Sequence, residues 1–271
     1  MTDSERKRMI REGFDTVAAN YDHPALGFFP QTAALILDTL QPPPTASLLD
    51  VCTGTGAVAL QAAARNPGGS VVGVDISAGM LAQARKKGRS LRLRNVVFRQ
   101  MDLEEPGIEG APFDIATCSF GLFFVDDMDR ALKNIAQSLK PGGRLAITSF
   151  AEDAFSPFAN LFLDQLKRAG AYVPPLSWKK LSREAQIGEL LTRAGIGRVE
   201  FRRAQMGYEL QSEHQWWDVV WNAGFRGLLN QLSETERRAF ADRHLSAVRE
   251  RYLAGERRLN IEVVLATGTR V

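Results

Sequence analysis

The stretch SLLDVCTGTGAVALQAAAR, residues 47–65, decides the fold of this chain. It opens with a short apolar run that contains Asp50, which is typical of a buried strand. Residues 57–65 are rich in alanine and favour a helix. The loop between them holds Gly54 and Gly56, where glycine lets the backbone approach a ligand and the helix start offers unpaired N–H groups. The stretch therefore predicts a strand, a ligand-binding loop and a helix.

Four similar apolar runs follow this unit and are separated by helical patterns. They cover residues 71–74, 96–98, 113–118 and 144–150. Short apolar runs that alternate with helices are typical of a parallel sheet, and right-handed crossovers place the helices on both of its faces. We therefore expect a doubly wound α/β fold, which binds ligands beyond the carboxyl ends of its strands.

The C-terminal part of the chain fits this sheet as insertions. Residues 197–206 are predicted to form a sixth strand, and residues 260–269 a last strand. Between them, two capping-box patterns begin at Ser212 and Ser233, and each is followed by apolar residues at helical spacing. We predict a helical lid over residues 208–252, inserted before a final antiparallel strand.

Composition restricts the class of protein. The 271 residues are 24% charged and 45% hydrophobic, as in an ordinary globular protein. Two cysteines, Cys52 and Cys118, and three scattered histidines give neither a disulfide framework nor metal-ligand spacing. The first residues are too charged for a signal peptide, and no apolar run is long enough to span a membrane. We expect a cytoplasmic protein without a metal.

One segment is strongly basic although the net charge is only +3. Residues 82–100 contain seven lysines and arginines and no acid. Such a run is either the solvated face of a surface helix or a phosphate-binding patch. Its first aromatic residue is Phe98, so stacking on bases is disfavoured, and we expect no nucleic-acid partner.

The acids at the strand ends indicate the ligand. Asp75 ends the second strand about 20 residues after the glycine loop, where an acid accepts hydrogen bonds from ribose hydroxyls. A dinucleotide site favours a third glycine, where this chain has Ala59. Asp50 repels phosphate but suits the ammonium of a methionyl group. The pattern favours S-adenosylmethionine, and a nicotinamide-dependent oxidoreductase is the less favoured alternative.

Five motifs together resemble a known family. They are residues 48–56, Val74–Ser77 with Met80 and Leu81, Asp102–Glu104, residues 113–122, and Leu139–Gly143. The set resembles the class I S-adenosylmethionine-dependent methyltransferases. Within them the chain is most similar to the ubiquinone/menaquinone-biosynthesis (UbiE-type) group, on Phe14-Asp15, Tyr21-Asp22 and residues 119–122. The resemblance covers about residues 10–150 and is far weaker beyond them.

The resemblance implies a seven-stranded Rossmann-like sheet and a cofactor site. It divides the chain into an N-terminal helical lid (1–45), a cofactor-binding core (46–150), linker helices with the sixth strand (151–207), a helical acceptor lid (208–258) and the last strand (259–271). Asp75 is expected to bind the ribose, Asp102 the adenine amino group, and Tyr21 to belong to the lid. The implied cofactor-binding residues are Tyr21, Asp50, Gly54, Thr55, Gly56, Asp75, Ile76, Met80, Met101, Asp102, Leu103 and Ser119.

Two positions depart from the pattern of that group. Cys52 replaces the first glycine of the loop, and its small side chain is expected to preserve binding. Phe123-Phe124 stands where quinone-methylating members usually carry Arg-Asn. We therefore expect a hydrophobic acceptor of aromatic, isoprenoid or polyketide type, methylated on carbon, oxygen or nitrogen. Quinone C-methylation and RNA methylation remain the alternatives.

Aromatic side chains are expected to dominate the acceptor side of the cavity. The enzyme is expected to be a monomer or a homodimer. The residues expected to face the acceptor are Phe120, Phe123, Phe124, Phe150, Phe155, Phe158, Tyr208, His214, Trp217 and Trp221. An acceptor that must lose a proton needs a base, and His214 is the first candidate, because imidazole titrates near neutrality. Tyr21 is the second catalytic candidate, and His23, Glu152 and Asp153 are weaker ones.

Overall fold

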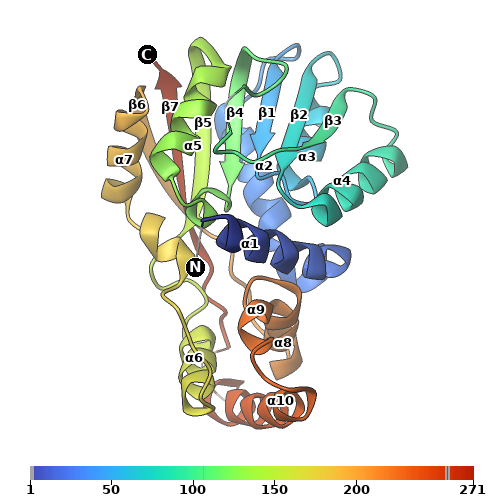
Figure 1. Cartoon of the computed structure of the whole chain (residues 1–271), viewed down its shortest axis with the longest axis vertical. Helices are drawn as coiled ribbons and strands as arrows, with labels where there is room; N and C mark the ends of the chain where they lie inside the picture. Colours follow the sequence, from blue (N-terminus) through green and yellow to red (C-terminus); the bar gives the residue numbers. More distant parts are fainter. Residues whose placement is uncertain (1–2, 106, 254, 256) are drawn as a thin grey trace.

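Seven strands form one mixed sheet in the part of the chain that this computed structural model describes, residues 3–105, 107–253, 255 and 257–271 (Figure 1). The strands lie in the order β3-β2-β1-β4-β5-β7-β6. Their bounds are β1 (Ser47–Val51), β2 (Ser70–Asp75), β3 (Val96–Gln100), β4 (Phe113–Ser119), β5 (Leu139–Phe150), β6 (Ile196–Gln205) and β7 (Glu262–Arg270).

The strand directions confirm the predicted topology. Strands β1 to β5 pair in parallel, and β7 is antiparallel to both β5 and β6. The strand order reverses between β1 and β4, and an open α/β sheet binds its ligand at such a point. The glycine loop that follows β1 lies there. One boundary differs from expectation: α5 ends at Ser138 and β5 already begins at Leu139, because Leu139 pairs with Phe113.

Helices cover both faces of the sheet. Helices α2 (Phe28–Leu40), α3 (Ala57–Arg65) and α4 (Ala78–Ser90) pack together on one face, and α5 (Met128–Ser138) and α7 (Glu184–Arg193) pack together on the other. Short helical turns connect these elements: η1 (Ala18–Asn20), η2 (Pro24–Leu26), η3 (Leu122–Phe124) and η4 (Ser177–Leu181). No helix in the described ranges has both the length and the apolarity needed to cross a membrane.

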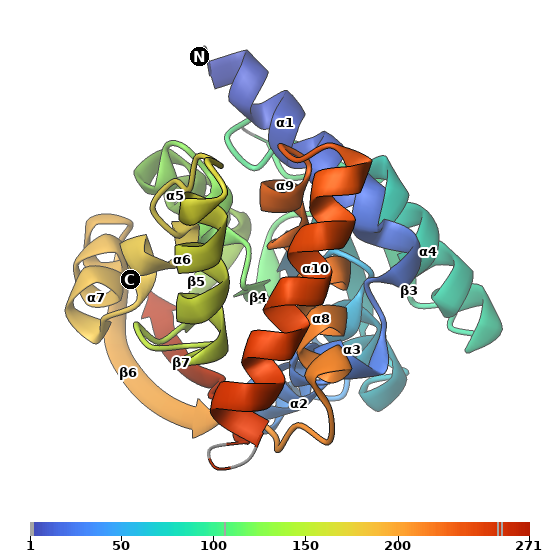
Figure 2. The same cartoon turned by 90° about the horizontal axis from the view of Figure 1, so that it is seen from below.

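A layer of helices lies beyond the carboxyl ends of the parallel strands. Helix α1 (Asp3–Val17) crosses this edge of the sheet, and below it lie α6 (Phe158–Arg168), α8 (Glu213–Asn222), α9 (Arg226–Leu229) and α10 (Glu234–Val248) (Figures 1 and 2). Helices α8 to α10 and the turn η5 (Arg249–Leu253) fall between β6 and β7 in the sequence, where the helical insertion is predicted.

A buried polar contact fixes the helices of this insertion. Trp216 donates its indole N–H to Nε2 of His244 at 2.8 Å, and Nδ1 of His244 lies 2.6 Å from Oε1 of Gln165. Both Trp216 and His244 are fully buried, and the rings of Phe162 and Phe240 pack against the imidazole. The contact joins α8, α10 and α6 in one apolar cluster.

Candidate active site

A cavity of about 340 Å³ opens at the carboxyl edge of the sheet beneath α1. Eleven of the twelve cofactor-binding residues expected from the sequence line this cavity, and Gly56 does not. They are Tyr21, Asp50, Gly54, Thr55, Asp75, Ile76, Met80, Met101, Asp102, Leu103 and Ser119. The residues come from the carboxyl ends of four neighbouring strands, from the segments that follow them and from the N-terminal segment, so the fold gathers them from distant parts of the sequence.

Gly54 and Gly56 have different structural roles in the loop. Gly54 has a left-handed φ of 55°, and a Cβ added there meets no atom within 4 Å, so open space lies in front of its backbone. Gly56 also has a left-handed φ, 86°, but a Cβ added there lies 3.1 Å from the side chain of Leu60 and 3.3 Å from that of Ala84. Gly54 thus leaves room for a ligand, whereas Gly56 lets α3 pack against α4.

Asp50 holds the loop from below. Its carboxylate is 1% exposed and accepts hydrogen bonds from Oγ1 of Thr53 at 2.6 Å, Oγ1 of Thr117 at 2.7 Å and the amide of Ala59 at 3.2 Å. Burial raises the pKa of Asp50 to about 6, although these hydrogen bonds favour the ionised form. The oxygens of Asp50 are therefore engaged by the protein, and the residue ties the loop and α3 to β4.

Asp75 connects the ends of two strands. Its Oδ2 accepts a hydrogen bond from the amide of Gly54 at 2.8 Å, and its Oδ1 accepts one from the amide of Ser77 at 2.9 Å. Burial raises the pKa of Asp75. Each carboxylate oxygen has two lone pairs, so both keep an acceptor position for a hydroxyl donor in the cavity.

The N-terminal helix forms the roof of the cavity. Ile10 and Phe14 of α1 line the cavity wall. Asp15 accepts hydrogen bonds from Oγ of Ser77 at 2.6 Å and from the amide of Gly79 at 2.8 Å, which fastens the end of α1 to the start of α4. A Cβ at Gly79 would lie 2.9 Å from Oδ1 of Asp15, so glycine permits this close approach.

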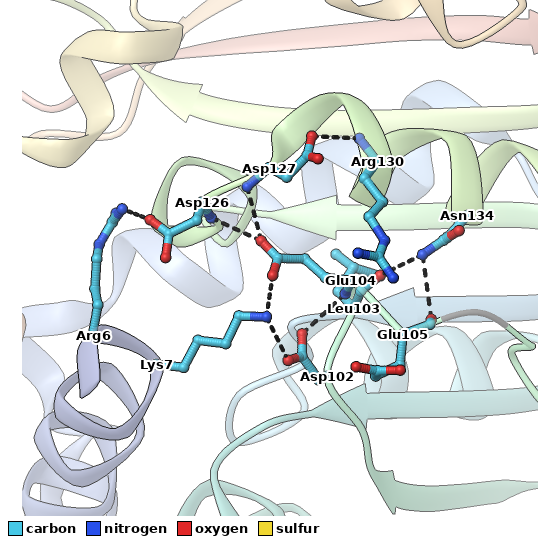
Figure 3. A network of polar contacts seen from close by, with 10 residues as sticks. All are labelled: Arg6, Lys7, Asp102, Leu103, Glu104, Glu105, Asp126, Asp127, Arg130 and Asn134. Carbon is cyan, nitrogen blue, oxygen red and sulfur yellow. Dashed lines mark hydrogen bonds and ion pairs between the residues drawn. The ribbon is translucent and has the colours of Figure 1, made fainter. Parts of the chain in front are cut away.

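The other end of α1 is held by a polar network around Glu104 (Figure 3). Glu104 is 5% exposed and accepts hydrogen bonds from the amides of Asp126 at 3.0 Å and Asp127 at 2.8 Å. Lys7 pairs with Glu104 and, at 2.9 Å, with Oδ2 of Asp102, while Arg6 pairs with Asp126. The network closes α1 over the loops that follow β3 and β4.

The charges in this network reinforce one another. Burial lowers the pKa of Lys7, but its hydrogen bonds to Glu104 and Asp102 outweigh that effect and the pKa is raised overall. Asp102, expected from the sequence to meet adenine, accepts from Lys7 on one oxygen and from the amide of Glu104 at 2.9 Å on the other. Lys7 is not among the residues expected from the sequence, because no local pattern shows that the first turns of α1 return to this site.

Comparison with known proteins decides the family. Residues 48–143 match the family model described as "Methyltransferase domain". Aklanonic acid methyltransferase DauC from Streptomyces sp. (strain C5) is 35% identical over 150 residues, which cover 55% of this chain and 68% of that protein. The ubiquinone/menaquinone biosynthesis C-methyltransferase UbiE of Geotalea daltonii is 32% identical over 165 residues, 59% of this chain and 70% of that one.

This chain is a class I S-adenosylmethionine-dependent methyltransferase of the UbiE-like type. The structure of the YcgJ protein from Bacillus subtilis has the same fold, with a TM-score of 0.60 at 19% identity over 89% of this chain and 98% of that one. The cofactor of the methyltransferase is S-adenosylmethionine, and its reaction is the methylation of a small molecule. The family expected from the sequence is confirmed.

The acceptor side of the methyltransferase differs in part from expectation. Of the ten residues expected to face the acceptor, only Phe120 and Phe124 line the cavity. Phe150 stacks on Phe120 at 4.2 Å behind the wall, and Phe123, Phe155 and Phe158 are likewise buried in the core. The hydroxyl of Tyr208 donates to the carbonyl of Ala25, whereas Trp217 and Trp221 stand outside the wall. The wall also contains Phe14 and Phe29, which the sequence analysis does not place at the acceptor.

The structure places the first candidate base, His214, outside the cavity. The side chain of His214 is 68% exposed beside Glu213 and lies outside the cavity lining, because it projects from the solvent face of the first turn of α8. Glu152 is likewise remote, since it forms an exposed ion pair with Arg183. Tyr21 does line the cavity, but burial raises the pKa of its phenol, so that it remains a hydrogen-bond donor at neutral pH.

His23 is the histidine that the methyltransferase presents to the cavity. Its Nδ1 accepts the amide hydrogen of Ala25 at 3.2 Å and caps the turn η2. This hydrogen bond assigns the proton of the neutral ring to Nε2, which makes Nε2 a donor. His23 is only a weaker candidate on sequence grounds, because its placement depends on how the lid folds back over the loop.

The basic run of residues 82–100 is partly engaged within the protein. Lys87 pairs with Asp22 at 2.7 Å, and Asp22 also accepts a hydrogen bond from Oγ1 of Thr55 at 2.7 Å. Arg85 donates to the carbonyl of Phe98 at 2.8 Å. Lys87 thus links α4, the N-terminal lid and the glycine loop, and it lines the cavity together with Asp22 and Thr55.

Proposed function

We propose that this methyltransferase acts on an apolar, ring-bearing small molecule and that it is not a quinone methylase of the housekeeping type. The observation that carries the proposal is Phe124, whose ring lines the cavity at the position where related quinone enzymes usually carry a polar residue. Phe14, Phe29 and Phe120 extend the same wall. Covering such rings with an acceptor gains roughly 25 cal/mol per Å² of apolar surface.

The cofactor fits the other half of the cavity. We assign the ribose hydroxyls to the free acceptor positions of Asp75 and the adenine amino group to Asp102. The side chains of Ile76, Met80 and Leu103 pack around the adenine, and all three line the cavity. The open space in front of Gly54 accommodates the methionyl part, with Asp50 as a positioning residue that holds the loop and contributes negative charge.

The residues of the acceptor half orient the reactants and exclude water. When bound, S-adenosylmethionine would supply an electrophilic methyl group: sulfur would keep the electron pair of the broken bond, and the acceptor atom would bond to the methyl carbon and release any proton it carries to water. In-line transfer of this kind depends mostly on positioning, and a closed apolar wall restricts the approach. Nε2 of His23 and the phenol of Tyr21 provide hydrogen-bond donors that hold an acceptor oxygen.

A substrate panel tests the proposal. It contains phenolic polyketide-type aromatics, a demethylmenaquinone and a structured RNA, each supplied with labelled S-adenosylmethionine. We expect methylation of the aromatic compounds alone. Methylation of the quinone as the best acceptor, or restored quinone synthesis in a strain that lacks its own quinone methylase, would contradict the proposal.

Variants at position 124 sharpen this test. Phe123 is 1% exposed, so an arginine at that position would bury a charge in the core. Phe124 is therefore the position to change. We expect Phe124→Arg to lower kcat/KM for the aromatic acceptor about tenfold or more, while cofactor affinity stays within about twofold. Phe201→Leu on β6, outside the cavity lining, is the matched control and should leave both unchanged. An unchanged kcat/KM in Phe124→Arg would remove the ring from the acceptor site.

A further inference from the structure

A second cavity, of about 280 Å³, lies between α1 and α9. Figures 1 and 2 both place α9 beside α1, on the side away from the sheet. Ala223, Gly224 and Gly227 form one wall of this cavity, and Gly13 forms part of the other. Met9 stands at its rim and is 59% exposed although it is apolar. The second cavity is therefore an apolar recess that opens to solvent.

Three side chains line both cavities. The cavity beneath α1, called the first cavity, shares three wall residues with the second cavity: Ile10, Phe14 and Phe124. The rings of Phe14 and Phe124 meet edge to face with their centres 5.1 Å apart. This ring pair, together with Ile10, thus stands between the two cavities. A molecule in the second cavity lies directly beyond the acceptor wall.

The second cavity also offers a positive charge. The guanidinium of Arg226 lies 4.3 Å from the ring centre of Trp221 in a cation–π contact, and Arg237 approaches the same ring at 5.8 Å. Within the described ranges no carboxylate lies at ion-pair distance from Arg226, whereas Arg6 on the opposite wall pairs with Asp126. A cation held on an aromatic ring at the edge of an apolar recess recognises an anionic group on an apolar ligand.

We propose that the second cavity binds the distal part of the methyl acceptor and that Arg226 binds an anionic oxygen group of that acceptor. This inference rests on the proposed function, because it takes the acceptor to be apolar. The acceptor is then an elongated apolar acid. One end passes between Phe14 and Phe124 to the methyl donor, and the other end lies between α1 and α9 with its carboxylate, or an equivalent anion, on Arg226.

The glycines of the second cavity supply a clean test. A Cβ added at Gly227 or at Gly224 meets no atom within 4 Å, and neither residue has a left-handed φ. A leucine at either position therefore fills the cavity without straining the backbone. Gly227→Ala adds only one methyl group and is the matched control for Gly227→Leu. Arg226→Met keeps a flexible side chain on Trp221 but removes the charge, and Arg226→Lys restores it.

The experiment uses the full chain with saturating S-adenosylhomocysteine, so that the cofactor half of the first cavity is filled. The probe is 8-anilinonaphthalene-1-sulfonate, an apolar ring compound with one anionic group, titrated by fluorescence and calorimetry. We expect one saturable site in the wild type, about tenfold weaker binding in Gly227→Leu and a smaller change in Gly227→Ala. Arg226→Met should weaken binding about fivefold, and Arg226→Lys less.

The outcomes separate this inference from the proposed function. The dissociation constant of S-adenosylhomocysteine and the melting temperature identify any variant that misfolds, in which case Gly224→Leu replaces Gly227→Leu. An absence of probe binding in the wild type, or equal binding in the wild type and the leucine variants, overturns the inference. If the leucine variants lose the probe but the wild type methylates none of the apolar acceptors, the second cavity stands and the proposed acceptor class is wrong.

Discussion

Gly121 and Cys52 approach so closely that a Cβ added at Gly121 would lie 2.2 Å from Cβ of Cys52 and 2.7 Å from its Sγ. Cys52 itself has a left-handed φ of 52°, a conformation that favours glycine. The contact joins the loop after β1 to the turn after β4, and both residues line the cavity beneath α1. Glycine at position 121 therefore compensates for the cysteine that occupies the first glycine position of the loop.

This contact predicts a rescue between two substitutions. Gly121→Ala should destabilise the protein by roughly 1–3 kcal/mol, because the added methyl group overlaps Cys52. The double variant Gly121→Ala/Cys52→Gly should recover most of that loss, since the remaining neighbour, Sγ of Cys118, lies at 3.5 Å, an ordinary contact. Urea unfolding of the four proteins in the cycle measures the coupling. Additive effects of the two changes would show that the two loops do not meet.

A second prediction concerns the network that closes α1. Glu104→Ala should lower stability by roughly 1–3 kcal/mol, because the partly buried amides of Asp126 and Asp127 lose their acceptor. Glu104→Gln should cost less, since its amide oxygen still accepts from both amides and only the charge opposite Lys7 is lost. Denaturant midpoints compare the two variants, with Glu109→Gln as an exposed control. Equal losses in the alanine and glutamine variants would assign the effect to the ion pair instead.

A third prediction tests Asp75 as the ribose acceptor. Asp75→Asn should weaken binding of S-adenosylhomocysteine by about 10- to 100-fold, roughly 1.4–2.7 kcal/mol. The cause is twofold: one acceptor oxygen becomes a donor, and that amide group then faces the amide of Gly54 or Ser77. Calorimetric titration measures the affinity, and Asp129→Asn in an exposed ion pair is the control. Wild-type affinity in a folded Asp75→Asn protein would refute the assignment.

A fourth prediction concerns pH and His244. Burial lowers the pKa of His244 to about 4, whereas histidine in an unfolded chain titrates near 6.5. Between these values the unfolded state binds more protons, so this contribution to stability is complete above about pH 6.5 and is lost as pH falls toward 4. The loss is on the order of 2–4 kcal/mol.

Substitution of His244 separates its contribution to stability from the contributions of other titrating groups. His244→Gln should flatten the dependence of the free energy of unfolding on pH between about 4.5 and 6.5, because no imidazole remains to be protonated. His214→Gln, on an exposed side chain, should reproduce the wild-type slope. Unfolding curves at several pH values provide the measurement. If His244→Gln retained the full slope, the acid sensitivity would belong to a different group.

Local sequence patterns were enough to predict the sheet and most of the residues that line the cavity beneath α1. The run of residues 47–65, the acid at position 75 and the alternation of apolar runs depend on local periodicity and on short spacings, which tertiary packing does not alter. The carboxyl ends of parallel strands meet at one edge, so residues that follow neighbouring strands had to come together. This is why eleven of the twelve expected residues line one cavity.

Which residues close the cavity, and which rings line it, depends on tertiary packing. Lys7, Phe14 and His23 reach the site because α1 and η2 fold back across the sheet, over separations for which the sequence has no periodic signal. Phe123 and Phe124 are neighbours in one short helical turn, yet the first packs into the core and the second faces both cavities. Side-chain direction in a turn depends on the elements packed around it, which local sequence does not encode.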